Sequence, residues 1–91
     1  MSSTEWFATQ KDNYFDWIYL DGDHSYEGVL SDLNNSRRVV KDGGIILGDD
    51  YAWPFQKHGK PGVTAAVDQF IEETGLKVLQ EGATTQFSIQ L

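Results

Sequence analysis

The sequence predicts an α/β fold of the order β-α-β-α-β-β, with parallel strands first and an antiparallel hairpin at the C-terminal end. Two short apolar runs, at residues 15–20 and 45–47, are typical of buried strands in parallel sheets. Each is followed by a segment whose apolar residues lie three and four positions apart, which is the spacing of one helical face. The last residues alternate between apolar and polar side chains, as expected for a strand with one face in water.

The first half of the chain contains one predicted strand and one predicted long helix. A weak helical pattern over residues 4–10 comes first, and the aromatic run from Phe15 to Leu20 then predicts a strand covered on both faces. The helix is expected over residues 25–40, with Lys41 near its negative end. We expect Gly43-Gly44 to end it. Its apolar face consists of Tyr26, Val29, Leu30, Leu33 and Val40.

The second half repeats the strand and helix and then changes character. Ile45-Ile46-Leu47 predicts a second buried strand, and a loop with three aromatic residues follows it at 50–60. Pro61 suits the first position of a helix, and Gly75 suits the position after its end. Residues 76–80 and 86–91 flank a turn and predict the hairpin. With no linker or repeat in the sequence, we expect residues 1–91 to form a single domain.

Composition and charge exclude several classes of function. The 91 residues are 40% hydrophobic and 13% aromatic, which is typical of a globular chain. The net charge of −7 disfavours binding to nucleic acid, because that binding needs cations to displace counterions from phosphates. The same charge disfavours an anionic membrane surface, and no apolar run is long enough to span a bilayer. Cysteine is absent, which fits a reducing compartment, and we expect a cytoplasmic location.

Acidic motifs follow both predicted strands. Asp21-Gly22-Asp23-His24-Ser25-Tyr26 comes after the first, and Gly48-Asp49-Asp50-Tyr51 comes after the second. Parallel neighbours lie about 4.8 Å apart, so the motifs are expected side by side at the sheet edge where α/β proteins bind ligands. Ligands that are all oxygen favour Mg²⁺, Ca²⁺ or Mn²⁺. His24 suits a general base, a metal ligand or a helix start.

Each motif also has a purely structural interpretation. Asp23 alone is better explained as a helix cap, and Asp49-Asp50 alone as a solvated turn. The aromatic residues of the 51–55 segment could pack on the rim of the core, and His58 is expected to be exposed. Taken together, however, two acidic motifs at two strand ends favour a site, because both fall on one edge of the sheet.

The stretch from Tyr14 to Glu27 resembles the C-terminal half of class I S-adenosylmethionine-dependent methyltransferases. The resemblance is greatest to a bacterial group whose fourth strand runs into Asp-Gly-Asp-His-Ser-Tyr. It continues through Lys41-Asp42-Gly43-Gly44 and the strand that ends in Asp49-Asp50, and through Pro61-Gly62-Val63. It covers roughly residues 11–91 and is specific over 14–51. It implies a partial Rossmann-like methyltransferase sheet, holding the fourth to seventh strands, with the last strand antiparallel between the fifth and sixth.

The resemblance also implies roles for the acidic residues. Asp21, Asp49 and Asp50 correspond to the ligands of a divalent cation, Mg²⁺ or Ca²⁺, in related O-methyltransferases, and Asp21 to a residue on the cofactor side. Asp23 or His24 would be catalytic and take the proton of the acceptor hydroxyl. The family binds S-adenosylmethionine mainly through a glycine-rich turn after its first strand, and this sequence has no such turn. We therefore expect the chain alone to bind that cofactor weakly or not at all and to be inactive.

Two other functions are compatible with these patterns. The first is a self-assembling structural or interaction module, because the apolar strand at 16–20 is expected to have an exposed edge. Such an edge predicts a homodimer or higher oligomer. The second is Mg²⁺-dependent phosphotransfer, because Leu20-Asp21-Gly22-Asp23 resembles the nucleophile motif of haloacid dehalogenases. The segment between the acidic motifs holds only one predicted helix, which is shorter than that family requires.

Overall fold

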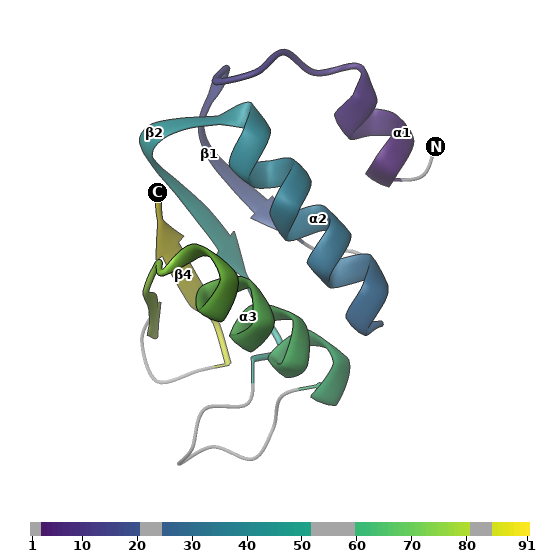
Figure 1. The fold of residues 1–91 in the computed structure, drawn as a ribbon, viewed down its shortest axis with the longest axis vertical. Helices are drawn as coiled ribbons and strands as arrows, with labels where there is room; N and C mark the ends of the chain where they lie inside the picture. Colours follow the sequence, from purple (N-terminus) through teal and green to yellow (C-terminus); the bar gives the residue numbers. More distant parts are fainter. Residues whose placement is uncertain (1–2, 21–24, 52–59, 81–84) are drawn as a thin grey trace.

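The computed structural model describes residues 3–20, 25–51, 60–80 and 85–91, which form one four-stranded sheet and three helices (Figure 1). The strands have the order β1-β2-β4-β3. The helices are α1 (Ser3–Ala8), α2 (Tyr26–Val39) and α3 (Pro61–Thr74), and the strands are β1 (Phe15–Leu20), β2 (Val40–Gly48), β3 (Val78–Gln80) and β4 (Phe87–Gln90). None of the helices in these ranges is long and apolar enough to cross a membrane.

The sheet has the mixed topology expected from the sequence. β1 and β2 are parallel and are connected by α2, while β4 is antiparallel to both of its neighbours, β2 and β3. The predicted α/β class and the C-terminal hairpin are therefore confirmed. The strand order implied by the resemblance is confirmed as well, because the last strand lies between the two that precede it along the chain.

The second helix begins as predicted but ends earlier. Ser25 caps it, because its side-chain oxygen accepts a hydrogen bond from the Gly28 backbone N–H at 3.1 Å. The expectation that Gly43-Gly44 ends the helix is wrong, since α2 ends at Val39 and β2 starts at the next residue. The physical reason is that Val40 is fully buried and pairs with Phe15, so the chain turns straight into the sheet.

The two glycines serve the start of β2 instead. Gly43 has φ of +83°, a left-handed conformation that favours glycine. A Cβ at Gly44 would lie 2.6 Å from the carbonyl oxygen of Asp16, so the two backbones approach too closely for a side chain. This close approach coincides with the register shift in β1 between Phe15 and Trp17.

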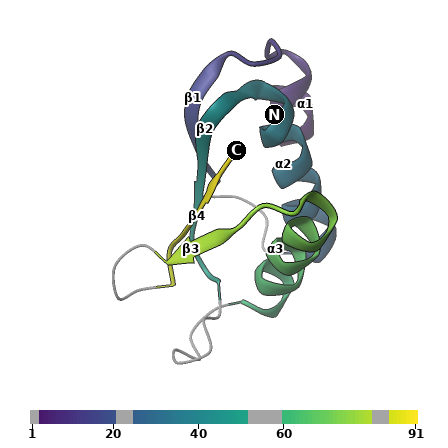
Figure 2. The same cartoon turned by 60° about the vertical axis from the view of Figure 1, so that its left-hand side comes forward.

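The expectation that β1 is covered on both faces is also wrong. All three helices lie on one side of the sheet, and Figure 2 shows that side clearly. On the helix side, Ile18 and Leu20 pack against the core, whereas on the other side Trp17 is 61% and Tyr19 42% exposed. An apolar run of six residues does not reveal which of its faces has a partner, because the covering elements are distant in the sequence.

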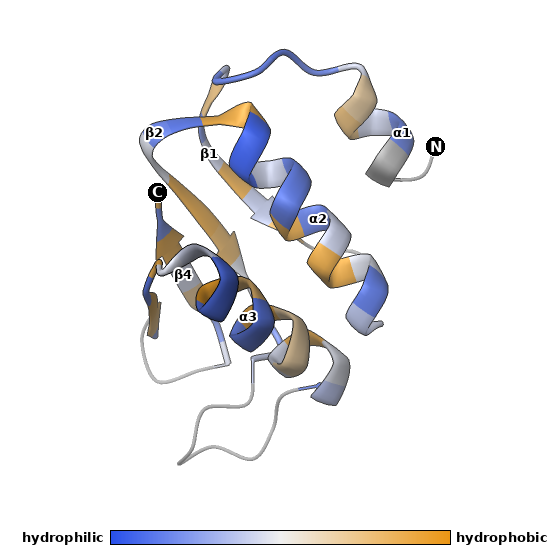
Figure 3. Ribbon diagram, in the orientation of Figure 1, coloured by the Kyte–Doolittle hydropathy of each residue, from blue (hydrophilic) through white to orange (hydrophobic). Residues whose placement is uncertain are grey.

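The core fills the space between the sheet and the helices α2 and α3. Its fully buried members include Leu33 on α2, Phe70 on α3 and Ile46 on β2, joined by Phe87 and Ile89 of β4. Figure 3 shows apolar residues gathered on β2 and on turns of these two helices. The core therefore holds β2 and β4 in place. The candidate site lies next to the point where the end of β2 pairs with the start of β4.

A smaller cluster attaches α1 to the end of α2. Phe7 packs with Val39 and Val40 there. Arg38 completes the attachment, because its guanidinium donates to the carbonyl oxygens of Phe7 at 2.5 Å and Gln10 at 3.1 Å. The Phe7 carbonyl oxygen also accepts from the backbone N–H of Gln10 at 3.0 Å, so Arg38 binds the turn that follows α1.

We expect Gly48→Ala to lower the free energy of unfolding by about 1–3 kcal/mol, because it overpacks the end of β2. A Cβ at Gly48 would lie 2.6 Å from Cε1 of Phe87, which is itself fully buried and cannot move into solvent. Urea-induced unfolding measures the effect. Gly75→Asn is the control, since it adds a side chain in open space at a left-handed position that asparagine tolerates. Equal stability of Gly48→Ala and the parent would contradict this packing.

Candidate functional site

The carboxyl ends of β1 and β2 leave the sheet at the same level. Leu20 pairs with Gly48, and these two residues directly precede Asp21 and Asp49 in the sequence. This register agrees with the sequence-based expectation that the motifs share an edge. The predicted catalytic residues Asp23 and His24, and the predicted ligand Asp21, lie outside the described residues.

Asp49 is held in place by two hydrogen bonds. Its Oδ1 accepts from the Thr85 hydroxyl at 2.5 Å and from the backbone N–H of Asp50 at 2.7 Å. The side chain is half-buried at the strand end. A carboxylate has roughly four lone-pair positions, so these two bonds leave capacity for a further ligand such as a cation. The two hydrogen bonds therefore fix the orientation of the Asp49 carboxylate and leave some of its lone pairs available.

Thr85 is a site residue that the sequence did not indicate. It precedes β4, and the pairing of Phe87 with Gly48 brings it beside the end of β2. Its carbonyl oxygen also accepts from the backbone N–H of Tyr51 at 3.1 Å, so Thr85 contacts the chain on both sides of Asp50. The contact with Asp49 spans 36 residues of sequence. Only the strand order could have revealed it.

Asp50 has an unusual backbone conformation. Its φ is +67°, in the left-handed region that aspartate tolerates better than most residues. Its carbonyl oxygen accepts from the backbone N–H of Lys60 at 2.7 Å, which joins the end of β2 to the start of α3. Such conformations cost on the order of 1–3 kcal/mol and concentrate at functional sites. The turn at Asp50 thus gives a second reason to place a site here.

Tyr51 connects this edge to the core and to α3. Its hydroxyl donates to Asp68 Oδ1 at 2.5 Å, and its ring lies 6.0 Å from that of Phe87 in an edge-on arrangement. Burial of the phenol, followed by the hydrogen bond and the negative charge of Asp68, raises the pKa of Tyr51 to about 12. The tyrosine is therefore a neutral donor at physiological pH. Tyr51 therefore packs against the core, as the structural interpretation of the 51–55 segment expects for its aromatic residues.

No complete metal centre is present within the described parts of the chain. They contain no cluster of three or more His, Cys, Asp or Glu side chains placed to hold an ion. Asp49 and Asp50 belong to the predicted set, and the third predicted ligand, Asp21, lies outside these parts. The donors of the set are all carboxylate oxygens, which suit Mg²⁺ or Ca²⁺.

Two comparisons with known proteins bear on this site. A family model described as a methyltransferase domain matches residues 1–51, from the start of the chain through both acidic motifs. An uncharacterized protein of Acanthamoeba polyphaga mimivirus is 34% identical over 61 residues. That alignment covers 67% of this chain and 26% of the viral protein, so the chain spans about a quarter of that relative's length.

Proposed function

This chain belongs to the methyltransferase domain family, and from that premise we propose that it forms the acceptor-binding and metal-binding part of an S-adenosylmethionine-dependent O-methyltransferase. The pairing of Leu20 with Gly48 carries the proposal, because the two strands end at one level and an acidic motif follows each of them in the sequence. Ligand sites of α/β sheets lie at this edge. The family match favours methyl transfer over the phosphotransfer alternative.

In this proposal the acidic residues divide between two tasks. Asp21, Asp49 and Asp50 would hold a Mg²⁺ or Ca²⁺ ion, whose charge lowers the pKa of the acceptor hydroxyl. Asp23 or His24 accepts the hydroxyl proton, which leaves an oxygen nucleophile. When bound, S-adenosylmethionine would supply the methyl group, which would pass directly from its sulfonium sulfur to the acceptor oxygen and leave a neutral thioether. Alignment of the two reactants contributes most of the rate in such a step.

Thr85 is the positioning residue of the proposed site. Its hydroxyl donates to Asp49 Oδ1 and so orients the other lone pairs of that carboxylate. Partners of this kind typically contribute 10–100-fold to metal affinity, because they remove the freedom of the ligand to rotate away. Asp50, turned by its left-handed backbone, would bring the second carboxylate of the pair.

The cofactor side of the reaction is proposed to need more than these 91 residues. The sequence has no glycine-rich turn between a strand and a helix start, and the mimivirus relative is far longer than the matched region. We propose that the chain alone binds S-adenosylmethionine weakly or not at all and does not catalyse transfer. Calorimetric titration with S-adenosylmethionine tests this, and clear saturable binding would contradict it.

Metal binding is tested separately by calorimetry with Mg²⁺ and Ca²⁺. We expect Asp49→Asn to weaken binding by about tenfold or more and Thr85→Val by about tenfold, the low end of the effect of a ligand's partner. Asp42→Asn is the control, because it removes the same charge from an exposed residue at the other end of β2. If Asp49→Asn binds both ions as the parent does, Asp49 is not a ligand and the metal site is wrong.

A further inference from the structure

Tyr51, the residue after the acidic pair, is held by three separate segments of the chain. Its backbone N–H donates to the Thr85 carbonyl oxygen at 3.1 Å, just before β4. Its hydroxyl donates to Asp68 Oδ1 on α3 at 2.5 Å, and its ring packs edge-on against Phe87. The side chain is buried, so it has little freedom to move. The chain is therefore fixed in place one residue beyond Asp50.

The turn at Asp50 depends on contacts of this kind. A residue other than glycine with φ of +67° is strained, and such a conformation persists only where the surrounding structure holds it. On one side of the turn, the Asp50 N–H is bonded to Asp49 Oδ1 at 2.7 Å. On the other side, Tyr51 and the bond from the Lys60 N–H to the Asp50 carbonyl oxygen hold the chain. Loss of a contact beyond Asp50 would let the turn relax toward the commoner negative φ.

Helix α3 supplies two of these contacts. Lys60 is its N-cap residue and Asp68 lies eight positions further along, so the two bonds are about 12 Å apart on the helix. Asp68 is exposed, so water can solvate its carboxylate and the phenol is not needed to compensate a buried charge. The bond between Tyr51 and Asp68 instead gives the end of β2 a fixed attachment to α3.

We propose that Tyr51 and Asp68 are positioning residues of the metal site, because their hydrogen bond holds the turn at Asp50. That turn sets the directions in which the carboxylates of Asp49 and Asp50 leave the end of β2. The inference rests on the proposed function, since it assigns both residues to the same ion site. A cation needs its carboxylate ligands to converge, and holding them in place beforehand removes an ordering cost from binding. Both residues act through the backbone of Asp50 and are not ligands themselves.

The coupling must work in both directions, because linkage between two binding equilibria is reciprocal. If the bond between Tyr51 and Asp68 strengthens ion binding, ion binding strengthens the attachment of α3 to the end of β2. The backbone amide of Lys60, which is bonded to Asp50, reports on that attachment. We expect saturating Mg²⁺ to slow hydrogen exchange of the Lys60 amide more in the parent than in Tyr51→Phe.

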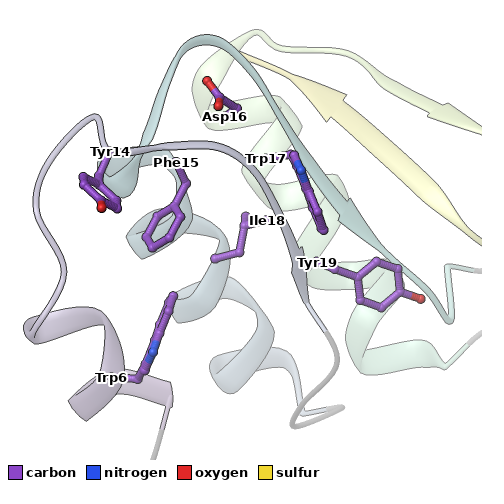
Figure 4. Close-up of a pocket in the computed structure, with 7 residues that line it drawn as sticks. All are labelled: Trp6, Tyr14, Phe15, Asp16, Trp17, Ile18 and Tyr19. Atoms are coloured by element: carbon purple, nitrogen blue, oxygen red, sulfur yellow. The ribbon is translucent and has the colours of Figure 1, made fainter.

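Isothermal titration calorimetry with Mg²⁺ compares Tyr51→Phe with a variant that loses stability elsewhere. We expect Tyr51→Phe to weaken binding by about fivefold, less than the 10–100-fold typical of a group that bonds a ligand directly, because Tyr51 acts through the backbone. Val39→Ala is the control and should leave binding unchanged. Val39 is fully buried in the smaller cluster at α1. Trp6 and Phe15 of that cluster line a hollow of about 620 Å³ along β1, away from the acidic pair (Figure 4).

Substitutions of Asp68 separate its hydrogen bond from its charge. Asp68→Leu removes the acceptor and is expected to weaken Mg²⁺ binding as much as Tyr51→Phe does. Asp68→Asn keeps an oxygen that accepts from the phenol, so it restores most of the affinity. Both variants lose one negative charge, and Glu72→Gln, at an exposed position on the same helix, measures that loss alone. Tyr51→Phe combined with Asp68→Leu should bind no more weakly than Asp68→Leu.

The parent and Asp49→Asn distinguish failure of this inference from failure of the metal site. If the parent binds no Mg²⁺, or if Asp49→Asn binds it as the parent does, the proposed site is wrong and the positioning role falls with it. If Asp49→Asn loses binding while Tyr51→Phe keeps the affinity of the parent, the site stands and the positioning role is overturned. Equal weakening by Tyr51→Phe and Val39→Ala would also overturn it, because a general loss of stability would then explain the effect.

Discussion

Phe70→Ala is expected to lower the free energy of unfolding by about 3–5 kcal/mol, the usual cost of removing a buried aromatic ring. Phe70 is fully buried on α3 and belongs to the cluster that joins α3 to Leu33 of α2 and Ile46 of β2. A chain of this size has a total stability on the order of 5–14 kcal/mol, so the variant loses a large share of it. Guanidinium-induced unfolding, followed by circular dichroism, measures the loss.

Leu79→Ala is the matched control for the core. Leu79 is 55% exposed on β3, so removing its side chain leaves no cavity, and we expect a change below about 1 kcal/mol. Similar midpoints for the two variants would show that α3 is not packed as the structure has it. The site depends on this packing, because the start of α3 is bonded to Asp50.

Tyr51→Phe is expected to show the second large effect, and its size should depend on pH. Near neutral pH the variant loses the hydrogen bond from the phenol to Asp68, which costs about 1.5–3 kcal/mol for a charged acceptor. In the parent, the pKa of Tyr51 is raised from 10.0 to about 12 by burial and by Asp68. The unfolded chain therefore ionises this tyrosine at a lower pH than the folded chain does.

The sign of the pH dependence follows from that order of ionisation. The contribution of Tyr51 to the free energy of unfolding is fully present below pH 10 and is lost as the pH rises toward 12. The loss is up to about 3 kcal/mol, because the pKa differs by about two units between the unfolded and the folded chain. Tyr51→Phe lacks this loss, so its deficit relative to the parent should shrink between pH 9 and pH 11. Urea-induced unfolding at both pH values measures the difference. Tyr14→Phe, at an exposed tyrosine, is the control, and parallel curves for the parent and Tyr51→Phe would contradict the raised pKa.

The sequence predicted only those site residues that lie directly after a recognisable strand. The acidic pairs were visible because each follows a strand-like run, and the register of Leu20 with Gly48 agrees with their expected alignment. Thr85 and Asp68 were not visible, because they reach Asp49 and Tyr51 from segments 36 and 17 residues away. No local pattern distinguishes them from other polar residues of a turn or an exposed helix face.

The sequence by itself determined the class of the fold and the order of its elements, because periodicity acts within a few residues; it placed the start of α2 near Ser25 but left Asp23, His24 and Ser25 open as its cap. Only the tertiary structure decided where α2 ends, which face of β1 is open and which residues surround Asp49. Those outcomes depend on which segments cover each other in space. An apolar strand has the same local sequence whether one of its faces is covered or both, and so the exposed face at Trp17 and Tyr19 became visible only in the assembled sheet.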